Sequence, residues 1–189
     1  MNNFYILLAV LAFVGLIAVA IHNGIIKNYN RVKQAWADVL TQERAKTNII
    51  PKVEQLAKEY KEFEQDLLQK VTKLREAIDV AGKGKEGDVD KIHNIHTASD
   101  ALSKGLKVAV EAYPELKANT MYLQLANEIA EQEENVAAAI RMFNSNVAVH
   151  NTSIETFPSS LVNASFTKKT SVKSFEYALA NLGFSPELS

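Results

Sequence analysis

The chain has 189 residues and carries 21 Lys and Arg against 22 Asp and Glu, so its formal net charge is −1. It therefore lacks the basic surplus that is typical of nucleic-acid-binding proteins, and we expect no nucleic-acid partner. The absence of cysteine excludes disulfides, thiolate metal sites and cysteine nucleophiles, which removes several enzyme classes.

The first 26 residues form an uncharged segment that predicts a membrane anchor. No Asp, Glu, Lys or Arg occurs before Lys27, and residues 4–21 are an unbroken apolar run. At ~1.5 Å rise per residue, a helix of this run approaches the ~30 Å core of a bilayer. We therefore predict a transmembrane helix within residues 1–26, with anchor positions at Phe4, Leu8, Leu11, Gly15 and Ile21.

A cleaved signal peptide is the competing interpretation of this segment. Ala18-Val19-Ala20 supplies the small residues of a cleavage site. A signal peptide, however, carries a basic region before an apolar core of about 7–15 residues, whereas only the terminal amine precedes this longer run. A retained anchor is the favoured prediction, and Gly15, between Ala12 and Ala18, gives it a small-residue spacing that lets membrane helices approach closely.

Basic residues flank the anchor on its C-terminal side. Lys27, Arg31 and Lys33 follow it, and no basic side chain precedes it. Because basic flanks favour the cytoplasmic side of a membrane, we predict an outward N-terminus and a cytoplasmic domain. Residues 27–189 are enough for one domain with its own core.

A heptad repeat of apolar positions extends over residues 29–78. Stepping alternately by four and three from Val32 meets an apolar residue at most positions, including Trp36 and Ile78. Such a repeat is typical of a long helix packed in a bundle or coiled coil. Pro51 has no N–H to donate and its ring crowds the preceding turn, so we predict a kink or a break there.

Glu43 and Lys46 are polar exceptions at two consecutive positions of this repeat. Beside the kink they are interpreted either as a solvated ledge or as a recognition point. Farther along, the glycine-rich residues 82–87 predict a turn that ends the first helix. This tract lacks the preceding strand and the closing Lys-Ser/Thr of a phosphate loop, so it does not predict a nucleotide site.

Two further helices follow the glycine-rich turn. Asp88 is a candidate cap for the second, which Tyr113-Pro114 ends because the residue before a proline is pushed away from helical angles. A second long heptad runs from Asn119 and stops at Phe157-Pro158. The pattern predicts three principal helices, packed antiparallel because their connections are short.

The tail, residues 159–189, is richer in Ser and Thr but keeps several large apolar side chains. We expect it to dock on the bundle, with a short helix over 172–182. No segment shows sustained period-two alternation, so no sheet is expected. The predicted fold is all-α: an N-terminal transmembrane helix (1–26), then an elongated antiparallel three- to four-helix up-down bundle (27–158).

Three blocks of sequence resemble the LemA family. The blocks, in the order of the family, are Tyr29-Asn30 with Ala35-Trp36 and Asn48-Ile49-Ile50-Pro51; EAYPELKAN, Glu111 to Asn119; and Glu133, Arg141, Phe143-Asn144, Asn151 and Thr156-Phe157-Pro158. The resemblance implies a bacterial protein of the cytoplasmic membrane, with one N-terminal span and an elongated helical domain. It implies no settled biochemical activity.

The histidines raise the question of a metal site. Asp90, His93, His96 and Asp100 lie near one face of the second helix, and a helical pair of histidines one turn apart can chelate zinc. There is no H-E-x-x-H arrangement, and Asp and His on a polar helix face are usually solvated. We therefore predict no metal and no cofactor, and His150, in a heptad position, is predicted to be an interior imidazole.

The polar residues of the third block admit two interpretations. Glu133 lies in the heptad seam, and Asn144 and Asn151 repeat one heptad apart beside it, with Arg141 on the same helix. Buried polar groups need partners and often fix the register between helices. The alternative is a contact for self-assembly or for a partner protein.

The EAYPELKAN block predicts a tight corner between two helices. Proline and the apolar residues around it suffice to define such a corner, in which Glu111 and Asn119 satisfy backbone donors. The residues of the corner are Glu111, Tyr113, Pro114, Leu116 and Asn119.

The leading functional hypothesis is a non-enzymatic, membrane-anchored helical scaffold. The single anchor and the long heptads favour a protein that assembles with itself and organises or remodels the membrane or its proteins. The second hypothesis is an adaptor or sensor subunit for a membrane protease or signalling protein, with the bundle as its docking surface.

Overall fold

The computed structural model describes residues 2–59, 61–84 and 88–175. These residues are almost entirely helical and include no strand, so the all-α prediction is confirmed. The elements in chain order are α1 (Asn2–Ala45), the 3₁₀ helix η1 (Lys46–Ile49), α2 (Ile50–Glu59), α3 (Lys61–Gly82), α4 (Val89–Ala112), the 3₁₀ helix η2 (Pro114–Ala118), α5 (Thr120–Glu155), α6 (Ser159–Val162) and the π-helical turn η3 (Asn163–Thr167).

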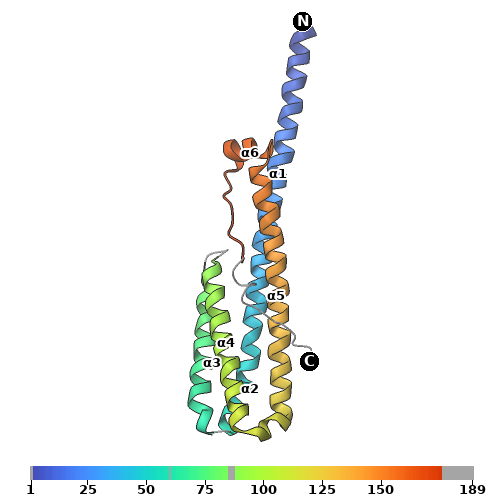
Figure 1. Ribbon diagram of the computed structural model, residues 1–189. Helices are drawn as coiled ribbons and strands as arrows, with labels where there is room; N and C mark the ends of the chain where they lie inside the picture. The colour runs from blue at the N-terminus through green and yellow to red at the C-terminus, as the bar shows by residue number, and fades with distance from the viewer. Residues whose placement is uncertain (1, 60, 85–87, 176–189) are drawn as a thin grey trace.

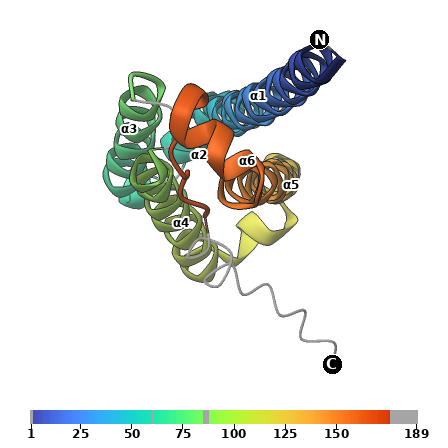
Figure 2. The same ribbon diagram turned by 90° about the horizontal axis from the view of Figure 1, so that it is seen from above.

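The helices form an elongated antiparallel bundle (Figure 1). α1 and α2 follow one another along its length, α3 returns beside α2, α4 descends beside α3, and α5 ascends beside α1. Seen from above, α2 to α5 and the C-terminal half of α1 surround a common core, while the N-terminal half of α1 projects beyond it (Figure 2). The core consists of the apolar faces of these helices and includes Trp36, Val53, Leu74, Ile95 and Phe143.

The prediction of one long helix up to Ile78 is wrong. α2 and α3 lie side by side with opposite chain directions, so the first heptad region supplies two arms of the bundle (Figure 1). Val53 before the reversal and Val71 after it are both buried in the same core. The apolar repeat therefore continues through the reversal. Residues 58–64, KEYKEFE, which include the end of α2 and the start of α3, contain no Gly or Pro that would predict a turn.

The interruption predicted at Pro51 is present. α-helical geometry ends at Ala45 and changes to the 3₁₀ helix η1, after which α2 begins at Ile50. Pro51 occupies the first turn of α2, where its missing N–H is tolerated. The change of geometry falls between Glu43 and Ile50, the stretch in which the polar exceptions of the heptad occur.

The EAYPELKAN corner connects α4 to α5. Tyr113 follows the last turn of α4, and η2 carries the chain across the end of the bundle with Leu116 buried beneath it. Asn119 caps α5, because its Oδ1 accepts hydrogen bonds from the backbone N–H groups of Met121 and Tyr122. These bonds satisfy donors that the first turn of a helix leaves free.

The tail lies along the bundle, but not as the predicted helix. α6 and η3 fold back beside α1, and residues 168–175, which we call the C-terminal strap, run without helical structure (Figure 1). The prediction of a helix over 172–182 is therefore wrong for residues 172–175. Residues 176–182 lie outside the described part of the chain.

Candidate functional site

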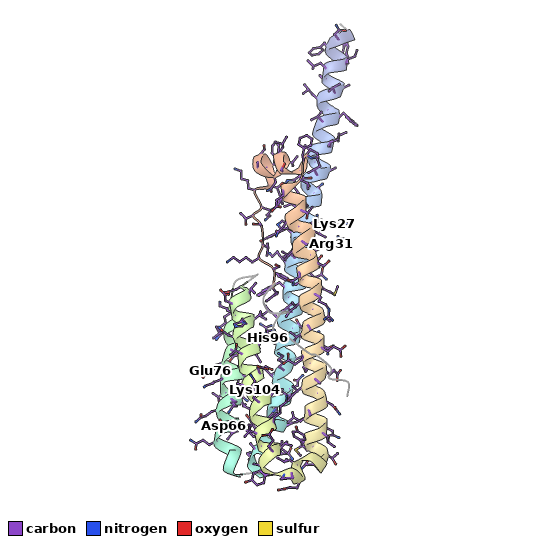
Figure 3. The ribbon with its side chains drawn as sticks, in the orientation of Figure 1. Lys27, Arg31, Asp66, Glu76, His96 and Lys104 are labelled. Atoms are coloured by element: carbon purple, nitrogen blue, oxygen red, sulfur yellow. The ribbon has the colours of Figure 1, made fainter. Side chains whose placement is uncertain are left out.

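Charged side chains from three parts of the chain meet inside the bundle. Glu43 is fully buried and Lys46 is 1% exposed, so neither forms the solvated ledge that the sequence allowed. Glu43 lies at the end of α1 and Lys46 in η1, while α4 and α5 supply the other members. We call this group the ionic cluster: Glu43, Lys46, His96, Ser99 and Glu133. Figure 3 shows His96 about midway along the bundle.

The lysine is central to the ionic cluster. Its Nζ lies 3.2 Å from Glu43 Oε2 and 3.0 Å from Glu133 Oε1. Ser99 Oγ donates a hydrogen bond of 2.7 Å to Glu133 Oε1, and His96 Nε2 lies 3.3 Å from Glu43 Oε1. The cluster therefore links α1, η1, α4 and α5 through polar contacts within an otherwise apolar core.

Local helix geometry explains how the sequence brings these groups together. Glu43 and Lys46 are three residues apart, as are His96 and Ser99, so each pair projects from one face of its helical segment. Glu133 occupies the facing seam of α5 and satisfies polar groups from both sides. Glu133 thus has the partners that a polar seam residue needs, and its role in fixing the register between helices stays a prediction.

Burial and charge shift the protonation equilibria of the ionic cluster. Burial raises the pKa of Glu43 to about 7, although Lys46 acts in the opposite direction. Burial, followed by the charge of Lys46, lowers the pKa of His96 to about 4. Burial works to raise the pKa of Glu133, but Lys46 and the Ser99 hydrogen bond outweigh it, so this pKa is lowered. At neutral pH the centre is a Lys46–Glu133 ion pair beside a neutral imidazole.

Replacing Glu43 by glutamine is expected to change how stability depends on pH. The folded pKa is raised from 4.5 to about 7, so wild-type stability contributed by this group is full below pH 4.5 and declines as the pH rises through 7. Relative to Glu43→Gln, wild type should therefore lose up to about 3 kcal/mol across this window. Urea unfolding of the detergent-solubilised full chain at a series of pH values measures the difference.

The titration of His96 is common to both proteins in that comparison. Its lowered pKa gives stability that is present above pH 6.5 and lost as the pH falls through 4, which is the opposite trend. Subtracting the two profiles isolates the contribution of Glu43. A difference in unfolding free energy that stays constant from pH 4.5 to 7 would contradict the assignment.

The C-terminal strap is held by side chains of α5. Asn151 pairs with the backbone of Val172 twice: Oδ1 accepts from its N–H and Nδ2 donates to its carbonyl oxygen, both at 2.9 Å. Asn144 Oδ1 accepts from the N–H of Phe175 at 2.8 Å, and His150 Nε2 lies 3.2 Å from the carbonyl oxygen of Thr170. The two asparagines thus do not register one helix against another, as the sequence suggested. Their side chains instead form hydrogen bonds with the strap backbone, as the backbone of a neighbouring β-strand would.

An aromatic contact closes the strap onto the bundle. The ring of Phe175 stacks on Trp36 with centroids 5.8 Å apart and meets Phe143 edge-on at 5.2 Å. All three side chains are buried. Such ring pairs stabilise beyond the area they bury.

Most of the apolar stretch of α1 is exposed in the part of the chain that the structure describes. The side chains of Phe4, Leu8 and Leu11 are exposed, and a Cβ added at Gly15 would meet no atom within 4 Å. Ile21, where α1 approaches the bundle, is half-buried. By length and composition this is a candidate membrane span.

The family model that matches the sequence decides its classification. The model of the LemA family aligns with residues 35–184. The chain belongs to the LemA family. The alignment covers the whole ionic cluster and the strap, and it begins after the apolar stretch of α1, so these two sites lie in the part of the chain that the LemA family shares.

A curated relative supports the same classification. Protein LemA of Metamycoplasma hominis is 30% identical over 137 residues, which make up 71% of this chain and 60% of the relative. The alignment thus spans less than two thirds of that protein. No solved structure matches the chain significantly.

The structure does not bring the remaining predicted residues of the LemA blocks into one site. Arg141, Glu111, Pro114 and Phe157 are exposed, and Pro158 is exposed beside Phe157. Sequence reasoning missed Ser99 as part of the ionic cluster and Phe175 as the partner of Trp36. Opposite charges at seam positions of separate helices are the signal that could have located the cluster.

The candidate zinc residues of α4 do not face one common site. Asp90, His93 and Asp100 are exposed, whereas His96 turns into the ionic cluster. Within the described residues, no group of three His, Asp or Glu side chains is arranged to hold a metal ion. In the cluster itself, the ammonium group of Lys46 supplies the positive charge between the two carboxylates.

Proposed function

We propose that this protein is a non-enzymatic, membrane-anchored helical scaffold whose copies associate and so organise the membrane or its proteins. The observation that carries the proposal is the continuity of α1. Over 44 residues, one helix bears an exposed apolar stretch at its N-terminal end and buried core residues such as Val32, Trp36 and Val39 farther along. A helix of this kind joins a bilayer span directly to a folded bundle.

The ionic cluster supports a structural role rather than catalysis. Its carboxylates and its lysine lie in contact with one another, and Glu43 and Lys46 are buried. Two surface hollows among the described residues are each lined by a single helix, one by α1 and the other by α3. Binding sites for small molecules instead draw polar groups together from several elements.

The proposed orientation follows from charge. Lys27, Arg31 and Lys33 follow the apolar stretch of α1, and in a bacterial cytoplasmic membrane such a flank favours a cytoplasmic bundle with the N-terminus outside. The proposed association uses the face of α1 that carries Gly15. No atom lies within 4 Å of a Cβ placed there, so the helix of a second copy has room to approach.

The mass of the intact protein, extracted together with its native lipids, tests the scaffold. We expect particles that contain a uniform multiple of the 20.9 kDa chain. Two differently tagged copies should co-purify when they are co-expressed, but not when they are mixed after extraction, which controls for chance trapping. A monomer, or one copy bound to a different protein, would contradict self-association and favour an adaptor subunit.

A further inference from the structure

We propose that residues 157–167, the elbow between α5 and the strap, lie in the headgroup layer of the same bilayer that α1 crosses. This inference rests on the proposed membrane anchoring and adds a second contact with the lipid. The elbow comprises α6 and η3 together with the two residues before α6.

The first argument is the position of the elbow. α6 and η3 pack against α1 at the end of the bundle from which α1, alone among the described helices, continues (Figure 1). A hydrogen bond of 2.9 Å joins Thr167 Oγ1 to His22 Nδ1, and His22 directly follows the apolar run that ends at Ile21. If the run spans the hydrocarbon core, His22 lies at its edge, and Thr167 lies at the same height.

The second argument is the exposure of apolar side chains on the elbow. Phe157 is 80% exposed, Leu161 61% and Phe166 71%, while Val162 between them is buried against the bundle. Three large apolar side chains turned outward within eleven residues form a local patch of the kind that marks a protein or membrane contact. Aromatic side chains are favoured at the boundary between hydrocarbon and headgroups.

The third argument is the charge around the elbow. Lys27 and Arg31 lie on α1 just below it, and Figure 3 shows both at this end of the bundle. Lys168 and Lys169 follow the elbow directly, whereas Glu155 is the sole acidic residue of the described residues 151–175. A basic collar beside an apolar patch is complementary to anionic lipid headgroups.

A bilayer fits this surface better than a second copy of the chain. The apolar side chains of the elbow and the cations around them lie near the height of His22 along α1, so one lipid surface can contact both. The elbow also continues the surface of α1 at the point where the span would leave the hydrocarbon core. We therefore assign this surface to the headgroup layer, and the experiment below can reveal a second copy in its place.

Single-cysteine spin labelling of the full chain tests the proposal, because the chain has no cysteine of its own. Labels at Leu161→Cys and Phe166→Cys report on the elbow. A label at Leu11→Cys reports on the span, and one at the exposed Met142→Cys of α5 serves as the control on the bundle. The protein is reconstituted in vesicles of phosphatidylethanolamine and phosphatidylglycerol, and relaxation by oxygen is compared with relaxation by a water-soluble nickel complex.

Both elbow labels are expected to be shielded from nickel severalfold relative to Met142→Cys and to gain accessibility to oxygen. Elbow labels that match Met142→Cys while Leu11→Cys remains in the lipid would overturn this inference and leave the anchor intact. Broadening at Leu161→Cys that disappears on dilution with unlabelled protein would show a second copy there and would also overturn it. A nickel-accessible Leu11→Cys would refute the anchor and the elbow contact together.

Discussion

Replacing Lys46 by alanine is expected to lower the free energy of unfolding by about 3–5 kcal/mol, the range for a buried ion pair that loses one partner. The substitution removes the cation that lies between the buried carboxyl group of Glu43 and the partly exposed carboxylate of Glu133. Lys46 is 1% exposed, so water cannot replace the lost contact without opening the bundle. Urea unfolding of the detergent-solubilised chain at neutral pH measures the change.

Lys52→Ala is the matched control for that experiment. Lys52 forms its ion pair with Glu128 at the surface, where both side chains are more than a third exposed. Such pairs contribute about 0–1 kcal/mol. Equal losses for Lys46→Ala and Lys52→Ala would contradict the assignment of the ionic cluster to the core. Adding Glu43→Gln and Glu133→Gln to Lys46→Met should recover most of the loss, because no buried charge then remains unpaired.

Replacing Phe175 by alanine is expected to detach the C-terminal strap. Truncating a buried phenylalanine costs about 3–5 kcal/mol. Because the strap lies outside the helices of the bundle, this loss should appear as local opening rather than as global unfolding. Trp36 then loses its stacked partner, and it is the one tryptophan of the chain, so its fluorescence reports on the opening.

The expected result for Phe175→Ala is a red-shifted Trp36 emission and stronger quenching by a water-soluble quencher. Faster hydrogen exchange at the amide of Val172, which Asn151 holds in wild type, should accompany it. Phe166→Ala removes an equally large but exposed ring and should change neither signal. Unchanged Trp36 emission in Phe175→Ala would show that the strap does not depend on this contact.

The sequence contained most of the information about the core. Heptad positions such as Val32, Trp36 and Ile140 are buried as the pattern predicts, because a 3.5-residue repeat keeps one face of a helix toward its neighbours. The same repeat hid the reversal between α2 and α3. An apolar stripe has no direction along the chain, so two antiparallel arms that face one core carry the same pattern as one long helix.

The candidate site was predictable only in part. Glu43, Lys46 and Glu133 stand out as polar residues in apolar seams, but a pattern along one helix does not identify which seam it meets. The roles of Asn144 and Asn151 required the path of the strap, which has no periodicity to reveal it. Phe175 was visible as a large apolar residue in the tail, yet its partner Trp36 lies far away in sequence.

The unbroken passage of α1 from its apolar stretch into the bundle also has a mechanical consequence. A transmembrane helix tilts to match the thickness of its bilayer. Because no hinge separates the span from the bundle, the proposed anchoring makes the bundle tilt together with the span. The bundle is about as long as the 36 residues of α5, about 54 Å at the standard helical rise. Small changes in span tilt would then sweep the η2 end through a much larger arc than the elbow.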